Sequence, residues 1–238
     1  NDVPTFTKGP NQTVSEDPGF QFVSNWATNI SAGPNESDGL SFQVTNNTNP
    51  TLFSQQPAVF TNGLLTYVPA FNASGSADIT IALKDNGGTA NGGVDTSAPQ
   101  TFTITVTAVN DAPLINFPPF VQTNQQTPLV FSGPTLSIGL SDVDAGSDPV
   151  RVTLTATQGT LTLPSTTGLT FVSGDGVDDA TMTFTGFIGT INFRLNGLTF
   201  KPNNGFAGSA SLQIVVDDQG HNGAGGAKSA TGNITINV

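Results

Sequence analysis

The sequence predicts an all-β protein made of two tandem β-sandwich domains. Its apolar residues alternate with polar ones, as along Phe102, Ile104 and Val106, which is the period of a strand with one buried and one solvated face. The chain contains 27 Gly and 16 Pro, and these turn residues separate the runs about every 8 to 15 residues, as in a sandwich. A length of 238 residues fits two domains that each bury a core.

A linker motif marks the expected domain boundary. The segment 109–113 (VNDAP) ends in a proline, which is incompatible with helix, and its core recurs at 1–4 (NDVP), an offset of 110 − 1 = 109 residues. We therefore expect one sandwich at 1–109 and a second at 110–238, with the linker as a short, stiff joint between them.

Alternation defines the clearest strands of each half. In the first half they lie at 79–83 and 102–106, and in the second half at 152–156 and 212–216. Earlier and weaker candidates lie at 12–14, 20–23, 40–44 and 64–68.

The second half repeats the first with a longer middle. Later positions correspond at an offset of 200 − 67 = 133 instead of 109. The matched pairs are Tyr67 and Phe200, Gly75 and Gly208, Ile79 and Leu212, Asp85 and Asp218, and Gly93 and Gly226. The difference, 133 − 109 = 24, predicts about 24 inserted residues between Gly159 and Leu198. In this insertion we expect a hairpin around 174–176, a strand at 181–185 and a short helix at 187–195.

Composition restricts the function. The net charge is −11, from 17 acidic and 6 basic residues, so nucleic acid is a poor partner. No run approaches the ~20 apolar residues of a membrane span, so we expect no membrane insertion. With no cysteine, thiol chemistry and disulfides are excluded. The chain opens and closes within its repeat pattern, which indicates a segment of a longer protein.

An enzymatic function has little support. His221 is the only histidine, and it lies in a glycine-rich stretch where a mobile loop residue is the simpler interpretation. The acidic pairs fall on expected interdomain loops with no aromatic-lined cleft suggested, which argues against glycoside hydrolysis. Trp26 is expected to be a partly buried sandwich residue, with a ligand platform as the alternative.

Acidic residues near the linker indicate a divalent cation site. Calcium takes six to eight oxygen ligands and tolerates loop geometry. The candidate ligands are Glu16 and Asp17 from the far end of the first domain, Asn110 and Asp111 from the linker, Asp142 and Asp144 from a loop, and Asp218 from a strand end. Strand parity turns Asp218 inward and Asp217 outward. The alternative is that Asp142, Asp144 and Asp148 only form Asx turns in a solvated loop.

Two further acidic groups are weaker candidates. The first-domain equivalent of the linker site is Asp2, Glu36, Asp38 and Asp85, which we expect to be half built because no domain precedes it in this chain. The group Asp175, Asp178 and Asp179 in the loop 174–179 is expected to form a turn, with a surface cation as the alternative.

Several motifs together resemble the cadherin-like repeats of bacterial surface proteins. They are the linker 109–113, the segment 15–17 (SED), the loop 141–146 (SDVDAG), the strand end 84–87 (KDNG), and the runs 174–176 (GDG) and 181–186 (TMTFTG). The resemblance covers nearly the whole chain. It implies cadherin-like Greek-key sandwiches joined end to end, calcium at the junctions, an extracellular location and no catalysis.

The chain departs from the animal cadherin pattern at two places. The acidic run expected before the penultimate strand reads Asn72-Ala73-Ser74 in the first half and Gly205-Phe206-Ala207 in the second. Gln125 and Gln126 replace Glu16 and Asp17, so a site following the second domain loses its charge. Fewer calcium ions per junction are therefore expected.

The sequence thus predicts a non-catalytic, calcium-binding tandem repeat of an extracellular surface or adhesin protein, in which calcium stiffens the junction of a spacer stalk. Its partners would be neighbouring repeats of the same chain. The alternative is a polysaccharide-binding or homophilic self-binding module of a secreted protein, with cell-surface glycans or a second copy as the partner.

Overall fold

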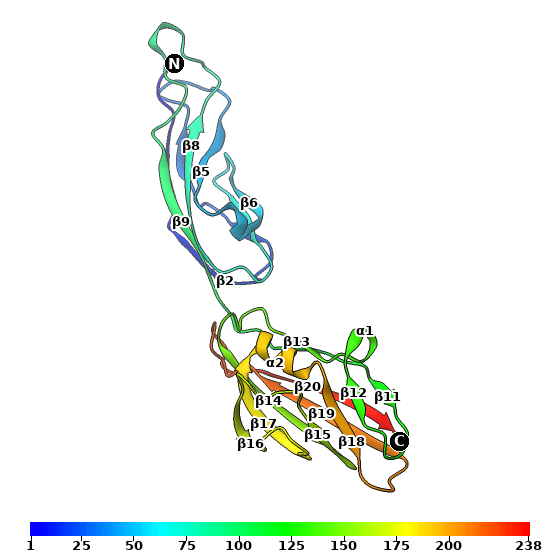
Figure 1. Cartoon of the computed structure of the whole chain (residues 1–238). Helices are drawn as coiled ribbons and strands as arrows, with labels where there is room; N and C mark the ends of the chain where they lie inside the picture. The colour runs from blue at the N-terminus through cyan, green and yellow to red at the C-terminus, as the bar shows by residue number, and fades with distance from the viewer. The chain divides into compact units, whose positions relative to one another are not determined.

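The computed structural model describes residues 1–238 and divides them into two compact units, unit 1 (Asn1–Val109) and unit 2 (Asn110–Val238) (Figure 1). Regular structure is almost entirely β-strand, and each unit encloses its own hydrophobic core. No helix is long and apolar enough to cross a membrane.

Unit 1 consists of two facing sheets. The four-stranded sheet has the order β2-β9-β8-β5 and the three-stranded sheet the order β3-β7-β6, while β1 pairs with β4. The strands are β1 (Thr5–Thr7), β2 (Gln12–Ser15), β3 (Gln21–Val23), β4 (Thr28–Ser31), β5 (Ser41–Asn47), β6 (Phe53–Val59), β7 (Leu65–Pro69), β8 (Gly75–Lys84) and β9 (Gln100–Thr107), with 3₁₀ turns η1 (Pro50–Leu52) and η2 (Ala90–Gly92). The chain crosses between the sheets after β5 and returns after β7, as in a Greek key.

The core of unit 1 lies between these sheets. Ile79, Ile81 and Ile104 are fully buried, as the alternation in β8 and β9 predicts. Trp26 is 3% exposed, so it belongs to the core and is more deeply buried than the sequence indicated. Its ring centroid lies 4.4 Å from that of Phe102, and its indole N–H donates to a backbone carbonyl at 2.9 Å.

Unit 2 repeats the sandwich with a wider first sheet. Its six-stranded sheet has the order β11-β20-β19-β14-β17-β16, its three-stranded sheet the order β12-β18-β15, and β10 pairs with β13. The strands are β10 (Leu114–Asn116), β11 (Phe120–Gln122), β12 (Leu129–Phe131), β13 (Gly139–Ser141), β14 (Pro149–Ala156), β15 (Gly159–Thr162), β16 (Thr170–Ser173), β17 (Thr181–Phe187), β18 (Leu198–Pro202), β19 (Ser209–Asp217) and β20 (Ser229–Asn237), with helices α1 (Gly133–Leu136) and α2 (Ile188–Leu195).

The two units share one pairing scheme. β2 lies parallel to β9 in unit 1, and β11 lies parallel to β20 in unit 2. Ser41 pairs with Lys84 across β5 and β8, and Arg151 pairs with Asp217 across β14 and β19. Lys84 and Asp217 are 217 − 84 = 133 residues apart, which is the same offset as that found in the sequence. The expected fold class, two cadherin-like Greek-key sandwiches in tandem, is therefore confirmed.

The segment between β15 and β18 has no counterpart in unit 1. It contains β16, β17 and α2. β17 pairs antiparallel with β14 along its length and places Met182 and Phe184, both fully buried, on the core side. The added strands therefore widen the sheet and extend the core.

Candidate metal centre

The linker asparagine is anchored to a strand end within unit 2. Asn110 is 1% exposed, and its Nδ2 donates to Asp218 Oδ2 at 2.7 Å and to the Gly226 carbonyl at 2.9 Å. Asp218 lies directly after β19 and is turned inward, and its Oδ1 accepts the backbone N–H groups of Gly220 and Lys228, each at 2.8 Å. Asp218 therefore holds Asn110, the first residue of unit 2, against the loop that follows β19.

The next linker residue meets the acidic loop after β13. The backbone N–H of Asp111 donates to Asp144 Oδ2, and the two carboxylates have oxygens within 4.8 Å of each other. Asp142 Oδ1 accepts the N–H groups of Asp144 at 2.8 Å and Ala145 at 3.1 Å, which is an Asx turn. The turn uses one oxygen of Asp142 and leaves Oδ2 buried without a hydrogen-bond partner.

An asparagine that the sequence did not single out supports this loop. Asn222 Nδ2 donates to the Asp144 carbonyl at 2.6 Å and to Asp148 Oδ2 at 2.9 Å. Asn222 thereby ties the glycine-rich segment after β19 to the acidic loop. One asparagine among many in loops gave no sequence signal for this role.

The charges in this part of unit 2 are not balanced by basic side chains. The ion pairs formed by lysine and arginine are Lys84 with Asp95 and Arg151 with Asp217, and neither involves Asp111, Asp142 or Asp144. The carboxylate oxygens of Asp111 and Asp144 lie within 4.8 Å of each other. Two unit charges at about that separation repel each other by about 1 kcal/mol in water and by roughly 3 kcal/mol at an effective dielectric constant near 20. A bound cation would convert this repulsion into attraction.

At the end of unit 1, Glu16 contacts Val109, the first residue of the linker. Glu16 follows β2, its backbone N–H donates to the Thr107 carbonyl at 2.9 Å, and its Oε1 accepts the backbone N–H of Val109. The neighbouring Asp17 is exposed, and its Oδ1 accepts the N–H of Asn72 at 3.0 Å. Of the two acids, Glu16 is the one held against the linker.

The start of unit 1 has the same arrangement. Asn1 Nδ2 donates to Asp85 Oδ1 at 3.1 Å, as Asn110 does to Asp218. The N–H of Asp2 donates to Glu36 Oε1 at 2.8 Å, as the N–H of Asp111 does to Asp144. The 109-residue offset could have identified Asn1 as a member of this set.

Asp38 lies in the same region of unit 1. A Cβ on Gly87 would lie 2.3 Å from Asn1 Oδ1 and 3.1 Å from Asp38 Oδ2, so these two oxygens are at most 2.3 + 3.1 = 5.4 Å apart. Because Gly87 has no Cβ, the Asn1 and Asp38 side-chain oxygens can both lie close to it.

Unpartnered oxygens concentrate in these acidic sets. Four buried side-chain oxygens have no hydrogen-bond partner, and three of them are Glu36 Oε2, Asp85 Oδ2 and Asp142 Oδ2. Asp85 as a whole is 3% exposed. Burying a polar atom without a partner costs about 1–3 kcal/mol, so three in the predicted ligand sets need an explanation. All the atoms that could coordinate a metal here are carboxylate, amide or backbone oxygens. Such ligands suit calcium and not a soft metal.

The third acidic group forms a turn of its own. Asp179 Oδ2 accepts the N–H groups of Asp175 at 3.0 Å and Gly176 at 2.8 Å, and Asp178 Oδ1 accepts the Thr160 hydroxyl at 3.2 Å. His221 is exposed in the loop that follows β19.

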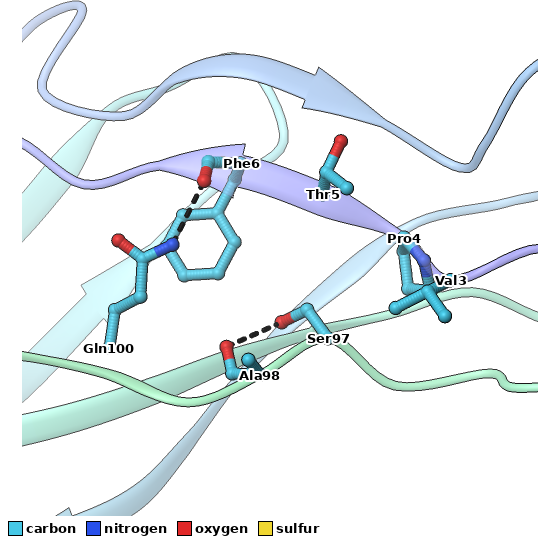
Figure 2. Close-up of a pocket in the computed structure, with 7 residues that line it drawn as sticks. All are labelled: Val3, Pro4, Thr5, Phe6, Ser97, Ala98 and Gln100. Carbon is cyan, nitrogen blue, oxygen red and sulfur yellow. Dashed lines mark hydrogen bonds between the residues drawn. The ribbon is translucent and has the colours of Figure 1, made fainter.

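Two hollows in the surface are lined by few ionisable groups. One, of about 170 Å³, lies beside β1 and is lined by uncharged residues; Figure 2 shows Gln100 directed at the Phe6 carbonyl and Ser97 at the Ala98 carbonyl. A second, of about 250 Å³, has Lys201 as its one ionisable lining residue. Neither contains a pair of carboxylates.

No protein-family model and no curated protein matches the chain. Solved structures similar to it include the EC1-2 fragment of human mucin-like protocadherin, at 14% identity with a TM-score of 0.41, covering 100% of this chain and 98% of that one. Another is CfaE, the adhesive subunit of the CFA/I fimbria of enterotoxigenic Escherichia coli, at 11% identity with a TM-score of 0.41, covering 98% and 99%.

A third is BT4661, a SusE-like surface-located polysaccharide-binding protein of Bacteroides thetaiotaomicron, at 8% identity with a TM-score of 0.30, covering 98% of this chain and 34% of that one. All three TM-scores lie below 0.5, so the fold assignment rests on the strand pairings given above.

Proposed function

We propose that the chain is a non-catalytic, calcium-binding pair of repeats from an extracellular surface or adhesin protein, in which calcium bound beside the linker stiffens the joint of a spacer stalk. The central ligands are Asp111, Asp142 and Asp144 of unit 2. Asn110 and Asp218 hold the linker in place for them, and Glu16 and Asp17 of unit 1 supply the remaining acids.

The observation that carries this proposal is the buried, unpartnered Oδ2 of Asp142. It belongs to a loop that also holds Asp144, whose carboxylate lies within 4.8 Å of that of Asp111. Repulsion between carboxylates and an unpaired buried oxygen both destabilise the loop, and one divalent cation relieves both.

Covalent connection makes Glu16 available to the same ion. Glu16 accepts the N–H of Val109, and Val109 is two residues from Asp111. Two residues of fully extended chain span at most about 7 Å. We infer that a cation held by both Glu16 and Asp111 would restrict the dihedral angles of the short segment between them, which is how calcium would stiffen the joint.

A second, weaker ion is proposed at the start of unit 1, held by Asp2, Glu36, Asp38 and Asp85. Two of its carboxylate oxygens are buried and unpartnered, Glu36 Oε2 and Asp85 Oδ2. A preceding repeat would complete this site, and the neighbouring repeats of a longer protein are accordingly the proposed partners.

Small-angle scattering in calcium and in chelator tests the stiffening. We expect the maximum dimension to be larger and better defined in calcium, and the difference to vanish in the Asp142→Ala, Asp144→Ala double variant. Asp178→Asn, in the turn after β16, is the control that should respond like the unaltered chain. A maximum dimension that is the same in both buffers would contradict the stalk.

A second candidate is recognition of a polysaccharide. It is favoured by Phe20 and Phe22, which are 41% and 67% exposed with ring centroids 4.2 Å apart, because exposed aromatic faces can stack on sugar rings. A glycan array with the unaltered chain and with Phe22→Ala separates the two candidates, since the stalk predicts no glycan binding by either.

A further inference from the structure

Unit 1 leaves open a sheet edge that unit 2 covers with a strand. β5 is the last strand of its four-stranded sheet and pairs only with β8, and in Figure 1 it lies beside β8. The equivalent strand of unit 2, β14, pairs with β19 on one side and with β17 on the other. One edge of β5 therefore presents unpaired backbone N–H and C=O groups.

The apolar face of β5 is also incomplete. Phe42 lies on the core side, with its ring centroid 5.0 Å from that of Phe6, and Val44 lies on the same face two residues on. The pairings Ser41–Lys84 and Arg151–Asp217 make Val44 the counterpart of Leu154. Val44 is 44% exposed, whereas Leu154 is fully buried, because β17 places Met182 opposite Leu154.

The covering strand in unit 2 shows what an occupant of the β5 edge needs. β17 runs antiparallel to β14 and sets Phe184 opposite Val152 and Met182 opposite Leu154. Its outward threonines join those of β14, as in the contact between the hydroxyl oxygens of Thr183 and Thr153 at 3.0 Å. An occupant of β5 thus needs apolar residues opposite Phe42 and Val44 and small polar residues between them.

β5 itself meets this requirement. Placed antiparallel to a second β5 with Gln43 opposite Gln43, it sets Phe42 opposite Val44, because 42 + 44 = 43 + 43. The two Phe42–Val44 pairs then share the core face, and the Gln43–Gln43 pair lies on the outer face. The strand carries no charge and no proline, so it lacks two common protections of an exposed edge.

We propose that β5 is a self-association edge through which two copies of the chain pair antiparallel about a two-fold axis at Gln43. The register shift between Val44 and Asn46 ends the regular edge, so the shared ladder is short. Each cross-strand pair contributes about 0.2–1 kcal/mol, and such a small interface belongs to the weak, transient class. The pairing uses no acidic residue and does not depend on calcium.

Disulfide trapping tests the register directly, because the chain has no cysteine. Under mild oxidation we expect full-length Gln43→Cys to form a disulfide-linked dimer at least about ten-fold faster than Thr13→Cys, a control on β2 at the opposite edge of the same sheet, because pairing raises the effective concentration.

Sedimentation equilibrium supplies the second measurement. The unaltered chain should show a mass that rises with concentration in both calcium and chelator, and Val44→Lys, checked for folding by circular dichroism, should remain a monomer. A mass that stays monomeric at every concentration, together with equal crosslinking of Gln43→Cys and Thr13→Cys, would overturn the self-association edge and leave the calcium proposal unaffected.

Discussion

Asn110 and Asp218 are 108 residues apart in sequence, and the Asn110 amide nitrogen lies 2.7 Å from Asp218 Oδ2 in a buried hydrogen bond. Asn1 and Asp85 repeat this contact at the start of unit 1, at 3.1 Å. In each unit the first asparagine is therefore tied to the residue that follows the next-to-last strand. The aspartate that comes next, Asp2 or Asp111, then donates its backbone N–H to an acidic side chain, Glu36 or Asp144.

Truncating the linker asparagine should destabilise unit 2. Asn110→Ala removes the donor to Asp218 and to the Gly226 carbonyl while both acceptors stay buried, so we expect a loss of about 1–3 kcal/mol in the free energy of unfolding. Chemical denaturation measures it. Asn233→Ala, at an exposed position of β20, is the control and should change stability by about 0.5 kcal/mol or less; equal losses would contradict the anchoring role.

Replacing the unpartnered carboxylate of the linker loop should have opposite effects in the two buffers. Asp142→Asn keeps Oδ1 for the Asx turn and replaces the unpartnered Oδ2 with a neutral amide. In chelator we expect unit 2 to gain up to about 1 kcal/mol, since a buried unpaired charge is removed. In calcium the variant should be less stable than the unaltered chain. Thermal unfolding in both buffers checks this, and a change of the same sign in both would count against a bound ion.

The site at the start of unit 1 should respond independently. Asp85→Asn retains the Oδ1 that accepts from Asn1 and Gly87 and neutralises the buried Oδ2. We expect this variant to lose the weaker phase of calcium binding while the linker phase persists. Terbium luminescence titration resolves the two phases; loss of both together would show that the two acidic sets do not act separately.

High pH should destabilise unit 1 through Tyr67. Burial raises the pKa of Tyr67 above its ordinary value of 10.0, so the unfolded chain loses this proton before the folded one does. The resulting stability is fully present below pH 10.0 and is lost as pH rises through the folded-state pKa. Unfolding measured between pH 9 and 11 should show this fall, which Tyr67→Phe should lack; identical pH profiles would contradict it.

Alternation predicted the strands that lie at the centre of each sandwich. The expected runs 79–83, 102–106, 152–156 and 212–216 fall within β8, β9, β14 and β19. Their inward residues are buried, and their outward residues are partly or fully exposed except Ala82, which is 3% exposed. The short helix expected at 187–195 is present as α2 (Ile188–Leu195). The strands that were missed include β1, β4, β6 and β10, which are short or irregular: β6 has two register shifts, and β1 has three residues. β20 was also missed, although it has nine residues and its burial alternates along most of its length.

The acidic residues could be found from sequence, but their hydrogen bonds could not. Repeat offsets pointed to Asp85 and Asp218 as equivalents, and in the structure each accepts a hydrogen bond from the asparagine at the start of its unit. Which oxygen of Asp142 makes a turn and which stays free depends on side-chain geometry. The open edge of β5 likewise becomes visible only when its pairing is compared with that of β14.

Calcium binding beside the linker is the central claim, and isothermal titration calorimetry of the full chain tests it most directly. We expect saturable heat with a dissociation constant of about 10⁻⁴–10⁻³ M, as in extracellular calcium modules, that is lost at the linker site in the Asp142→Ala, Asp144→Ala double variant and kept in Asp178→Asn. No saturable heat up to about 10 mM calcium, ten times the weak end of that range, would contradict the claim.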